Sequence, residues 1–243
     1  MATSTQSIRE IVSSQSSAAA VLQRFDIDLC SHADASLNQA CADLQLSVDQ
    51  ILEKLADAAA NEQGTVTTDF DSCSMSRLIQ HIVRSHHQYV RRELPLLTQM
   101  AQRVAAKHGD RAPELAKVKH LVDELCCEMF AHIEKEENIL FPFIVEMEQQ
   151  FVARCAPPRG CFATVAQPVS MMIVEHGMAE NRLAEIRELT NRYVPPAWAC
   201  PTFIALFSGL REFAADLRQH VHLENNFLFS RAVELEAELA RSK

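Results

Sequence analysis

An eleven-residue pattern that occurs twice constrains the fold of this chain more than any other feature. Segment 132–142, HIEKEENILFP, aligns without gaps with segment 220–230, HVHLENNFLFS, and the two copies begin 88 residues apart. In an α-helix, residues four apart lie one above the other on the same face. Each copy therefore predicts a helix that presents an imidazole and a carboxylate to one point. The two pairs are His132 with Glu136, and His220 with Glu224.

A further histidine precedes each copy on the preceding periodic segment. His86 lies 46 residues before His132, and His176 lies 44 residues before His220. Each half of the pattern thus predicts a helical hairpin, with His on the first helix and His-x-x-x-Glu on the second. Apolar residues at helical spacing share a face with the six candidate side chains, so we expect all six to point into a core. These apolar residues include Ile79, Ile82, Leu125, Met129, Met172, Leu183, Leu210 and Leu217.

The rest of the pattern predicts an all-α chain in two parts. With only 5 Gly among 243 residues, and with turn signals between long periodic segments, the chain favours a four-helix bundle within residues 65–243. Residues 1–64 predict a small helical domain and the start of a linker, with helix caps at Ser36 and Ser47. The expected long helices are 75–107, 112–150, 168–192 and 201–240; the expected short ones are 17–25, 36–43 and 47–60.

The six inward side chains predict a two-metal site. Burying carboxylates and imidazoles without compensation costs several kcal/mol or more per charge, which bound cations offset. If both glutamates bridge, each metal has two nitrogen and two oxygen ligands, and a shared oxo or hydroxo bridge leaves one octahedral position open. That ligand set suits iron or manganese better than zinc. A single His-x-x-x-Glu is more often an ordinary polar pair, but here it recurs in a matching frame. The metal ligands predicted are His86, His132, Glu136, His176, His220 and Glu224.

Two carboxylates and two histidines lie near the predicted ligands in the sequence, none more than one helical turn away. Glu128, one turn before His132, and Glu175, beside His176, are candidates to orient ligand histidines, with solvated surface an equal alternative for Glu175. His87 and His222 are rotated away from the inward face, and we expect both on the surface.

Charge and composition exclude other function classes. The net charge of −9 disfavours nucleic-acid and membrane surfaces. The polar N-terminus, and the lack of an apolar run that spans a bilayer, predict a cytoplasmic protein. In that compartment the eight cysteines, none in a CxxC pair, are expected to be free thiols.

These motifs resemble the repair-of-iron-centres (RIC) family, hemerythrin-like di-iron proteins of bacteria that respond to nitric oxide and oxidative stress. The resemblance covers nearly the whole chain and rests on the segments below. It implies a small N-terminal domain of the ScdA type, two iron ions bridged by both glutamates, and a cluster that binds nitric oxide or supplies iron to damaged iron-sulfur proteins. The matching segments are Arg84-Ser-His86, His132-x-x-x-Glu136, Glu175-His176 and His220-x-x-x-Glu224-Asn-Asn226.

One departure from the family pattern affects the expected activity. Where the family carries Asp-[Phe/Tyr]-Cys-Cys-Gly-Gly, this chain reads Asp28-Leu-Cys30-Ser31-His32-Ala33 and lacks one thiol and both glycines. The resemblance therefore favours nitric-oxide binding over full repair activity, as in members from denitrifying bacteria. Two alternatives stay open: a di-iron enzyme that reduces nitric oxide or peroxide, and a structural or iron-sensing bundle. The oligomeric state is not predicted.

Overall fold

The computed structural model describes residues 2–15, 18, 21–22, 25, 27, 32, 34–63, 73–155, 158, 160 and 162–241. In these residues the regular elements are helices, and one isolated bridge pairs Ser7 with Ser36. The all-α prediction is thus confirmed. Among the described helices, none combines the length and the apolar character needed to cross a lipid bilayer.

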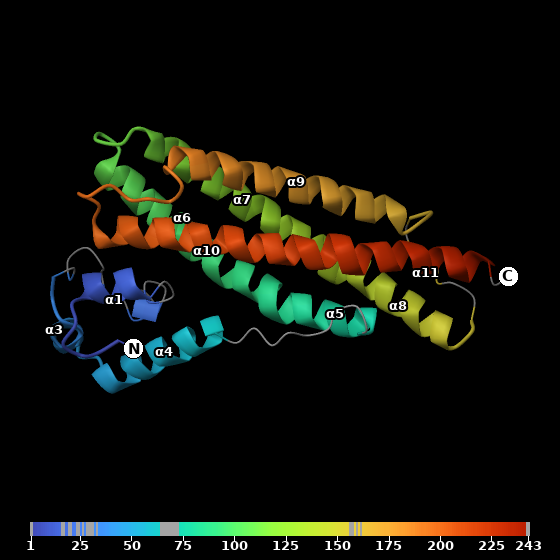
Figure 1. Ribbon diagram of the computed structural model, residues 1–243, viewed down its shortest axis with the longest axis horizontal. Helices are drawn as coiled ribbons and strands as arrows, with labels where there is room; N and C mark the ends of the chain where they lie inside the picture. Colours follow the sequence, from blue (N-terminus) through green and yellow to red (C-terminus); the bar gives the residue numbers. More distant parts are fainter. Residues whose placement is uncertain are drawn as a thin grey trace. The chain divides into compact units, whose positions relative to one another are not determined.

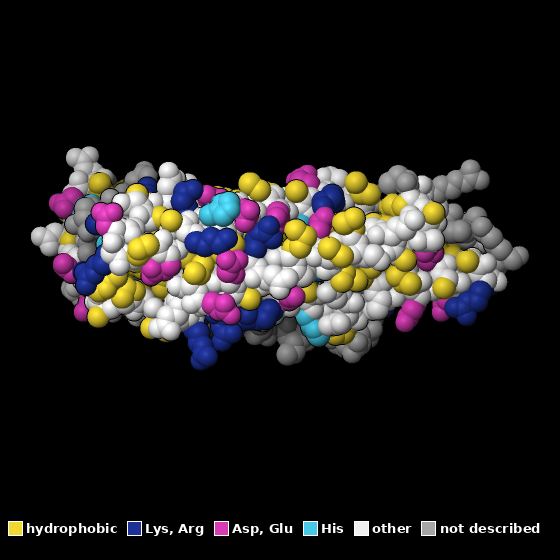
Figure 2. All heavy atoms as spheres, turned by 90° about the horizontal axis from the view of Figure 1, so that it is seen from above, with side chains coloured by type: hydrophobic (Ala, Val, Ile, Leu, Met, Phe, Trp, Pro, Cys, Tyr) yellow, Lys and Arg dark blue, Asp and Glu magenta, His cyan; other side chains and the backbone are white. Residues whose placement is uncertain are grey.

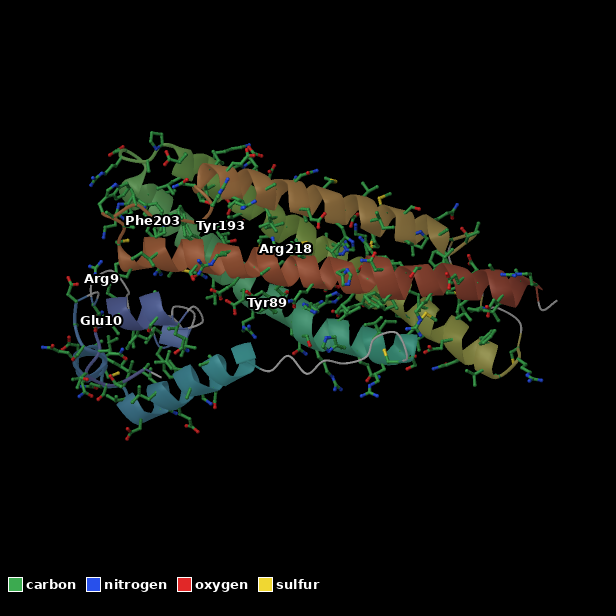
Figure 3. All side chains as sticks on the ribbon, in the orientation of Figure 1. Arg9, Glu10, Tyr89, Tyr193, Phe203 and Arg218 are labelled. Atoms are coloured by element: carbon green, nitrogen blue, oxygen red, sulfur yellow. The ribbon has the colours of Figure 1, made fainter. Side chains whose placement is uncertain are left out.

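Three short helices precede the long ones: α1 (Ile8–Ser14), α3 (Leu37–Asp43) and α4 (Val48–Gln63). The predicted start of α3 is confirmed, because the Ser36 hydroxyl accepts the amide of Gln39 at 3.3 Å. Helix α1 was not predicted. It begins with a capping box in which Ser7 Oγ accepts from the amide of Glu10 and the Ser7 amide donates to the Glu10 carboxylate. Figure 3 labels Glu10 in this first turn. Most of the predicted helix 17–25 lies outside the described residues, and so does most of the predicted linker.

The four long segments of the sequence correspond to four runs of helix, coloured from teal to red along the chain in Figure 1. The first run contains α5 and α6, the second α7 and α8, the third α9 alone, and the fourth α10 and α11. Their starts agree with the turn signals within two residues. The bounds are α5 Met75–Ile82, α6 Gln88–His108, α7 Glu114–Lys135, α8 Phe141–Val152, α9 Ala166–Leu189, α10 Pro201–Leu223 and α11 Ser230–Arg241.

Three of these runs contain a π-helical segment that the sequence pattern does not predict. The segments are η1 (Val83–His87), η2 (Glu136–Leu140) and η3 (Glu224–Phe229). A π-turn contains one residue more than a turn of α-helix. Every side chain after it is therefore rotated about the helix axis by one residue step, about 100°. Each segment lies at a predicted metal ligand, and such insertions are frequent at functional sites.

By its internal packing the described chain divides into two compact units. One unit comprises 1–67, 93–122 and 186–213; the other comprises 68–92, 123–185 and 214–243. The division falls within α6, α7, α9 and α10. The second unit has its own apolar core, built from α5, α8, α9 and α11 together with residues of η2 and η3, and includes Leu78, Ile82, Ile144, Met172, Leu228 and Leu235. It also contains all the predicted metal ligands. The domain boundary predicted after residue 64 lies among residues outside the described part and stays a prediction.

Charged side chains of both signs are intermixed on the face shown in Figure 2. Lys and Arg lie among Asp and Glu there, and hydrophobic side chains occur between them. The described part of this face therefore presents no continuous basic track of the kind that holds a nucleic-acid backbone.

Two glycines make a matched stability test. At Gly109, a Cβ atom would lie 2.6 Å from the backbone oxygen of Ala105, whereas at Gly177, within α9, it would meet nothing within 4 Å. We expect Gly109→Ala to destabilise the fold by about 1–3 kcal/mol through this clash. Gly177→Ala should stabilise it by about 0.5–1 kcal/mol, because alanine loses less entropy in a helix. Urea unfolding of the two variants measures both; destabilisation by Gly177→Ala would contradict the open space beside it.

Candidate metal centre

Six buried side chains converge in two groups that share both glutamates. In each group the candidate ligand atoms lie within 4.8 Å of one another. We name position A the group defined by His87 and His220, and position B the group defined by His132 and His176. Glu136 and Glu224 belong to both positions. All six side chains are buried, with 0–2% of each residue exposed.

The same nitrogen of every histidine, Nε2, faces the centre. In position A the Nε2 atoms of His87 and His220 are 3.2 Å apart, and in position B those of His132 and His176 are 3.1 Å apart. Two neighbouring ligands on a first-row metal ion with bonds of about 2.1 Å lie about 3.0 Å apart. Each pair thus has the spacing of two ligands on one ion, which is also the spacing that a shared proton allows.

The two glutamates stand between the histidine pairs. Glu224 contacts His220 Nε2 through one oxygen at 2.9 Å and His176 Nε2 through the other at 3.0 Å. Glu136 Oε2 lies 3.3 Å from His132 Nε2 and 3.4 Å from His87 Nε2. Each carboxylate therefore reaches one histidine of position A and one of position B, as a bridging ligand must.

Glu136 provides the test of whether a metal fits this site. Its side chain is fully buried, and neither carboxylate oxygen forms a hydrogen bond of normal geometry with any described residue. A buried carboxylate without such partners costs several kcal/mol unless a cation compensates it. With four imidazole nitrogens around the carboxylates of Glu136 and Glu224, the donor set fits a pair of first-row transition-metal ions, iron included.

Without metal, protons take over part of this compensation. Burial alone would lower the pKa of His87, but the carboxylates of Glu136 and Glu224 outweigh it and raise the pKa to about 10. The pKa of His132 is raised to about 9 by Glu136, Glu224 and Glu175 against the same burial. The pKa of Glu224 is held well below its usual range, because the histidines around it offset its burial. A metal ion must therefore displace protons from His87 and His132.

The raised pKa values of His87 and His132 predict that the stability of the metal-free protein depends on pH. Because the folded-state pKa of His87 and His132 lies above the unfolded value, their stabilising contribution is complete below pH ~6.5 and is lost as the pH rises through about 9 to 10. We expect the thermal midpoint of chelator-treated protein, followed by circular dichroism, to fall between pH 7 and 9.5. His87→Leu should flatten this fall. A midpoint that stays constant in the metal-free parent protein would contradict the raised pKa values.

Three of the four histidines hydrogen-bond through their outer nitrogen to a side-chain acceptor. His87 Nδ1 lies 2.8 Å from Glu137 Oε1, and Arg91 holds that carboxylate through both of its terminal nitrogens, at 2.7 and 3.2 Å. The remaining pairs are His132 Nδ1 with Glu175 Oε2 at 3.0 Å, Glu175 with Lys135, and His176 Nδ1 with Asn225 Oδ1 at 3.1 Å. Such partners fix the ring and make its inner nitrogen a better ligand.

The structure brings five of the six predicted ligands together and replaces the sixth. His86 belongs to neither position: its Nδ1 pairs with Asp216 Oδ1 at 2.9 Å, and its ring stacks on that of His220 with centroids 5.7 Å apart. His87 takes the place expected for His86. The expectation that His87 lies on the surface is wrong, since its side chain is fully buried. The cause is η1, whose extra residue puts His87, five residues after the buried Ile82, on the inward face.

The two carboxylates proposed as orienting groups have different surroundings. Glu175 contacts His132, whereas Glu128 pairs with Arg182 at 2.5 Å. Sequence reasoning missed Glu137 and Asn225. Their place in the repeat could have indicated both residues, because Glu137 directly follows Glu136 and Asn225 directly follows Glu224.

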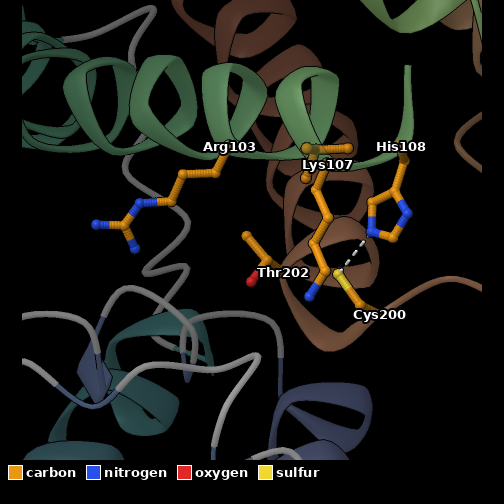
Figure 4. Close-up of a pocket in the computed structure, with 6 residues that line it drawn as sticks. Arg103, Lys107, His108, Cys200 and Thr202 are labelled. Atoms are coloured by element: carbon orange, nitrogen blue, oxygen red, sulfur yellow. Dashed lines mark hydrogen bonds between the residues drawn. The ribbon is translucent and has the colours of Figure 1, made fainter. Parts of the chain in front are cut away.

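A second cluster of reactive side chains lies in the other unit. Figure 4 shows His108 Nε2 next to Cys200 Sγ, 3.2 Å apart, beside Arg103, Lys107 and Thr202. The cavity between them measures about 30 Å³, enough for about two or three water molecules.

Comparison with known proteins decides the family. The profile of the hemerythrin HHE cation-binding domain matches residues 78–232, and that of ScdA_N, a domain of unknown function, matches residues 4–59. A relative from Haemophilus influenzae is 32% identical over 94% of this chain and 96% of its own length. The chain belongs to the repair-of-iron-centres family of hemerythrin-like proteins. Relatives from Pectobacterium atrosepticum and Enterobacter are 33% and 34% identical over 96% of this chain and 99% of theirs, and both are named iron-sulfur cluster repair protein YtfE.

Family membership agrees with the geometry. All six converging side chains lie inside the matched hemerythrin HHE segment, whose description as a cation-binding domain fits the buried donor set. The N-terminal match confirms the expected ScdA-type domain. The altered segment Asp28–Ala33 lies, except for His32, outside the described residues, so the expectation attached to Cys30 and Ser31 stays a prediction.

Proposed function

We propose that this hemerythrin-like chain holds two iron ions, one in position A and one in position B. Glu136 and Glu224 serve as bridging ligands. The observation that carries the proposal is that two fully buried carboxylates are shared between two pairs of converging imidazoles. Two nitrogens and two oxygens for each ion leave further octahedral positions for a bridging oxo or hydroxo group and for an external ligand.

From this site the chain acts in the nitrosative and oxidative stress response of the bacterial cytoplasm. It supplies iron for the repair of damaged iron-sulfur proteins and binds nitric oxide, lowering its concentration. The names of the YtfE relatives support the repair role. Bound ferrous iron supplies the affinity for nitric oxide, and the histidine-rich donor set supports a binding function over the oxygen-activating chemistry of carboxylate-rich di-iron sites.

One set of measurements tests this function. The protein is purified anaerobically, its metals are counted by mass spectrometry, and the reduced form is titrated with nitric oxide while optical and spin-resonance spectra are recorded. We expect about two irons per chain and a nitrosyl signal that saturates stoichiometrically. In parallel, the iron-loaded protein is mixed with a metal-free iron-sulfur protein, sulfide and reductant, and cluster assembly is followed by absorption.

Each outcome points to one function. Cluster assembly that depends on the loaded protein supports iron supply, and a stoichiometric nitrosyl supports nitric-oxide binding. Sustained turnover of nitric oxide or peroxide would favour a di-iron enzyme instead. Fewer than two irons in a fully reconstituted protein would overturn the proposed centre.

A further inference from the structure

The two metal positions differ in the hydrogen bonds behind their histidines. In position B, both histidines have a side-chain acceptor at the outer nitrogen: Glu175 for His132 at 3.0 Å, and Asn225 for His176 at 3.1 Å. An acceptor there holds the ring in place and increases the electron density at the inner nitrogen, which strengthens the bond to a metal. Position B is therefore supported on both sides.

Position A has such support on one side only. His87 has Glu137 at 2.8 Å, but Nδ1 of His220 is buried and has no hydrogen-bond partner among the described residues. Because the His220 side chain is fully buried, bulk solvent does not reach this nitrogen. The inner nitrogen of His220 is thus the least supported of the four.

The internal repeat explains the difference. The residue before His176 is Glu175, which supports the histidine of the opposite hairpin; the residue before His87, the counterpart of His176, is His86. At this place His86 offers His220 a stacked ring instead of an oxygen, with an interplanar angle of 8°.

His86 also engages the nearest carboxylate on the helix of His220. Asp216 precedes His220 by four residues, one turn earlier on the same face, which is where an acceptor for His220 would be found. Its Oδ1 is paired with His86 at 2.9 Å instead, while its Oδ2 is buried without a hydrogen bond to a described residue. His86 therefore both replaces one acceptor and diverts another.

We propose that the iron in position A is the one that the chain gives up first, that position B retains its iron, and that His86 sets this order by leaving His220 without an acceptor. The inference rests on the proposed function, since it requires two bound irons. It adds that iron supply is a one-ion process: the chain delivers the ion held by His87 and His220 and keeps the other. Outer partners change metal affinity by about 10–100-fold, so we expect the two ions to differ by about 10-fold in rate of loss.

The first test measures the order of release in the full-length protein. Reduced, fully loaded protein is mixed with excess ferrous chelator, and the absorbance of the iron-chelator complex is recorded. We expect two phases of equal amplitude with rates about 10-fold apart. Crystals of protein trapped after the fast phase, measured at the iron absorption edge, should show an anomalous peak between His132 and His176 and a strongly reduced one between His87 and His220.

Two substitutions test the cause. In His86→Gln, the amide offers His220 an acceptor of the type that Asn225 offers His176 and still donates to Asp216, so the fast phase should slow by about 10-fold and approach the slow one. In Asn225→Leu, His176 of position B loses its hydrogen-bond acceptor, so the rate of the slow phase should increase by about 10-fold. His81→Gln is the matched control, because His81 contacts His86 edge-on rather than His220, and it should change neither rate.

Every result decides between the alternatives. Equal occupancy of both positions after partial release, or earlier loss from position B, would overturn the inference while leaving two bound irons and the proposed function intact. Loss of iron in His86→Gln would show that His86 is itself a ligand, which also overturns it. Fewer than two irons in the parent protein would instead overturn the proposed centre, before any order of release is measured.

Discussion

Replacing Glu224 by Gln is expected to remove both irons, a larger effect than the loss of any single histidine of the centre should have. Glu224 is fully buried and reaches His220 with one oxygen and His176 with the other, so it serves position A and position B at once. The neutral amide offers one acceptor oxygen and an NH₂ group that cannot bind a metal. Because outer partners alone cost about 10–100-fold in affinity, loss of a shared ligand should weaken both ions by more than about 100-fold.

The measurement is iron per chain after reconstitution, with circular dichroism to show that the variant remains helical. Glu234→Gln is the matched control, since Glu234 is exposed on α11, and it should retain two irons. The thermal midpoint should respond in parallel: iron addition should raise that of the control but not that of Glu224→Gln, because binding stabilises only a protein that binds. Two retained irons in Glu224→Gln would show that Glu224 is not a ligand.

Much of this centre follows from the sequence because its geometry is repetitive. His-x-x-x-Glu within an amphipathic helix has only one way to point both side chains inward, and two matching copies imply two matching hairpins. The ends of the helices could also be predicted, since turn residues around Gly109 and before Pro201 interrupt the apolar pattern. Local rules of this kind predict the four long helical runs and five of the six side chains that converge on them.

Of the outer partners, only Glu175 was among the predicted candidates, because such partners depend on contacts between different helices. Asn225 and Glu137 occupy equivalent places in the repeat, yet one is an amide and the other a carboxylate held by Arg91. Glu128, one turn before His132, is turned toward Arg182 instead of the centre. Spacing along one helix shows which face a side chain occupies, and only the packing of the neighbouring helix decides what it meets.

The choice between His86 and His87 depends on a single inserted residue. An uninterrupted α-helix from Met75 places His86 beside Ile79, Ile82 and Val83, and the periodicity therefore selects it. The π-turn at η1 rotates the following side chains by about 100° and selects His87. No residue in Val83–His87 signals this turn, since the segment contains neither Gly nor Pro.

The last prediction therefore compares the two neighbouring histidines directly. His87→Leu should leave one iron per chain, because position A then retains only His220 and the bridging glutamates, while position B keeps all its ligands. His86→Leu should leave two, because His86 contacts Asp216 and the ring of His220 but belongs to neither position. Leucine suits both places sterically, since both side chains are buried and His87 already stacks on Phe141.

Iron analysis and the optical spectrum of the oxidised protein distinguish the two outcomes. His87→Leu should lose the absorption of a bridged pair of ions together with one iron, whereas His86→Leu should keep both. The reverse pattern would mean that the helix around Val83 is α-helical in the iron-loaded protein and that His86 is the ligand. Because the two variants differ by one position and make the same chemical change, a general loss of stability cannot produce this contrast; only the register of one helical turn can.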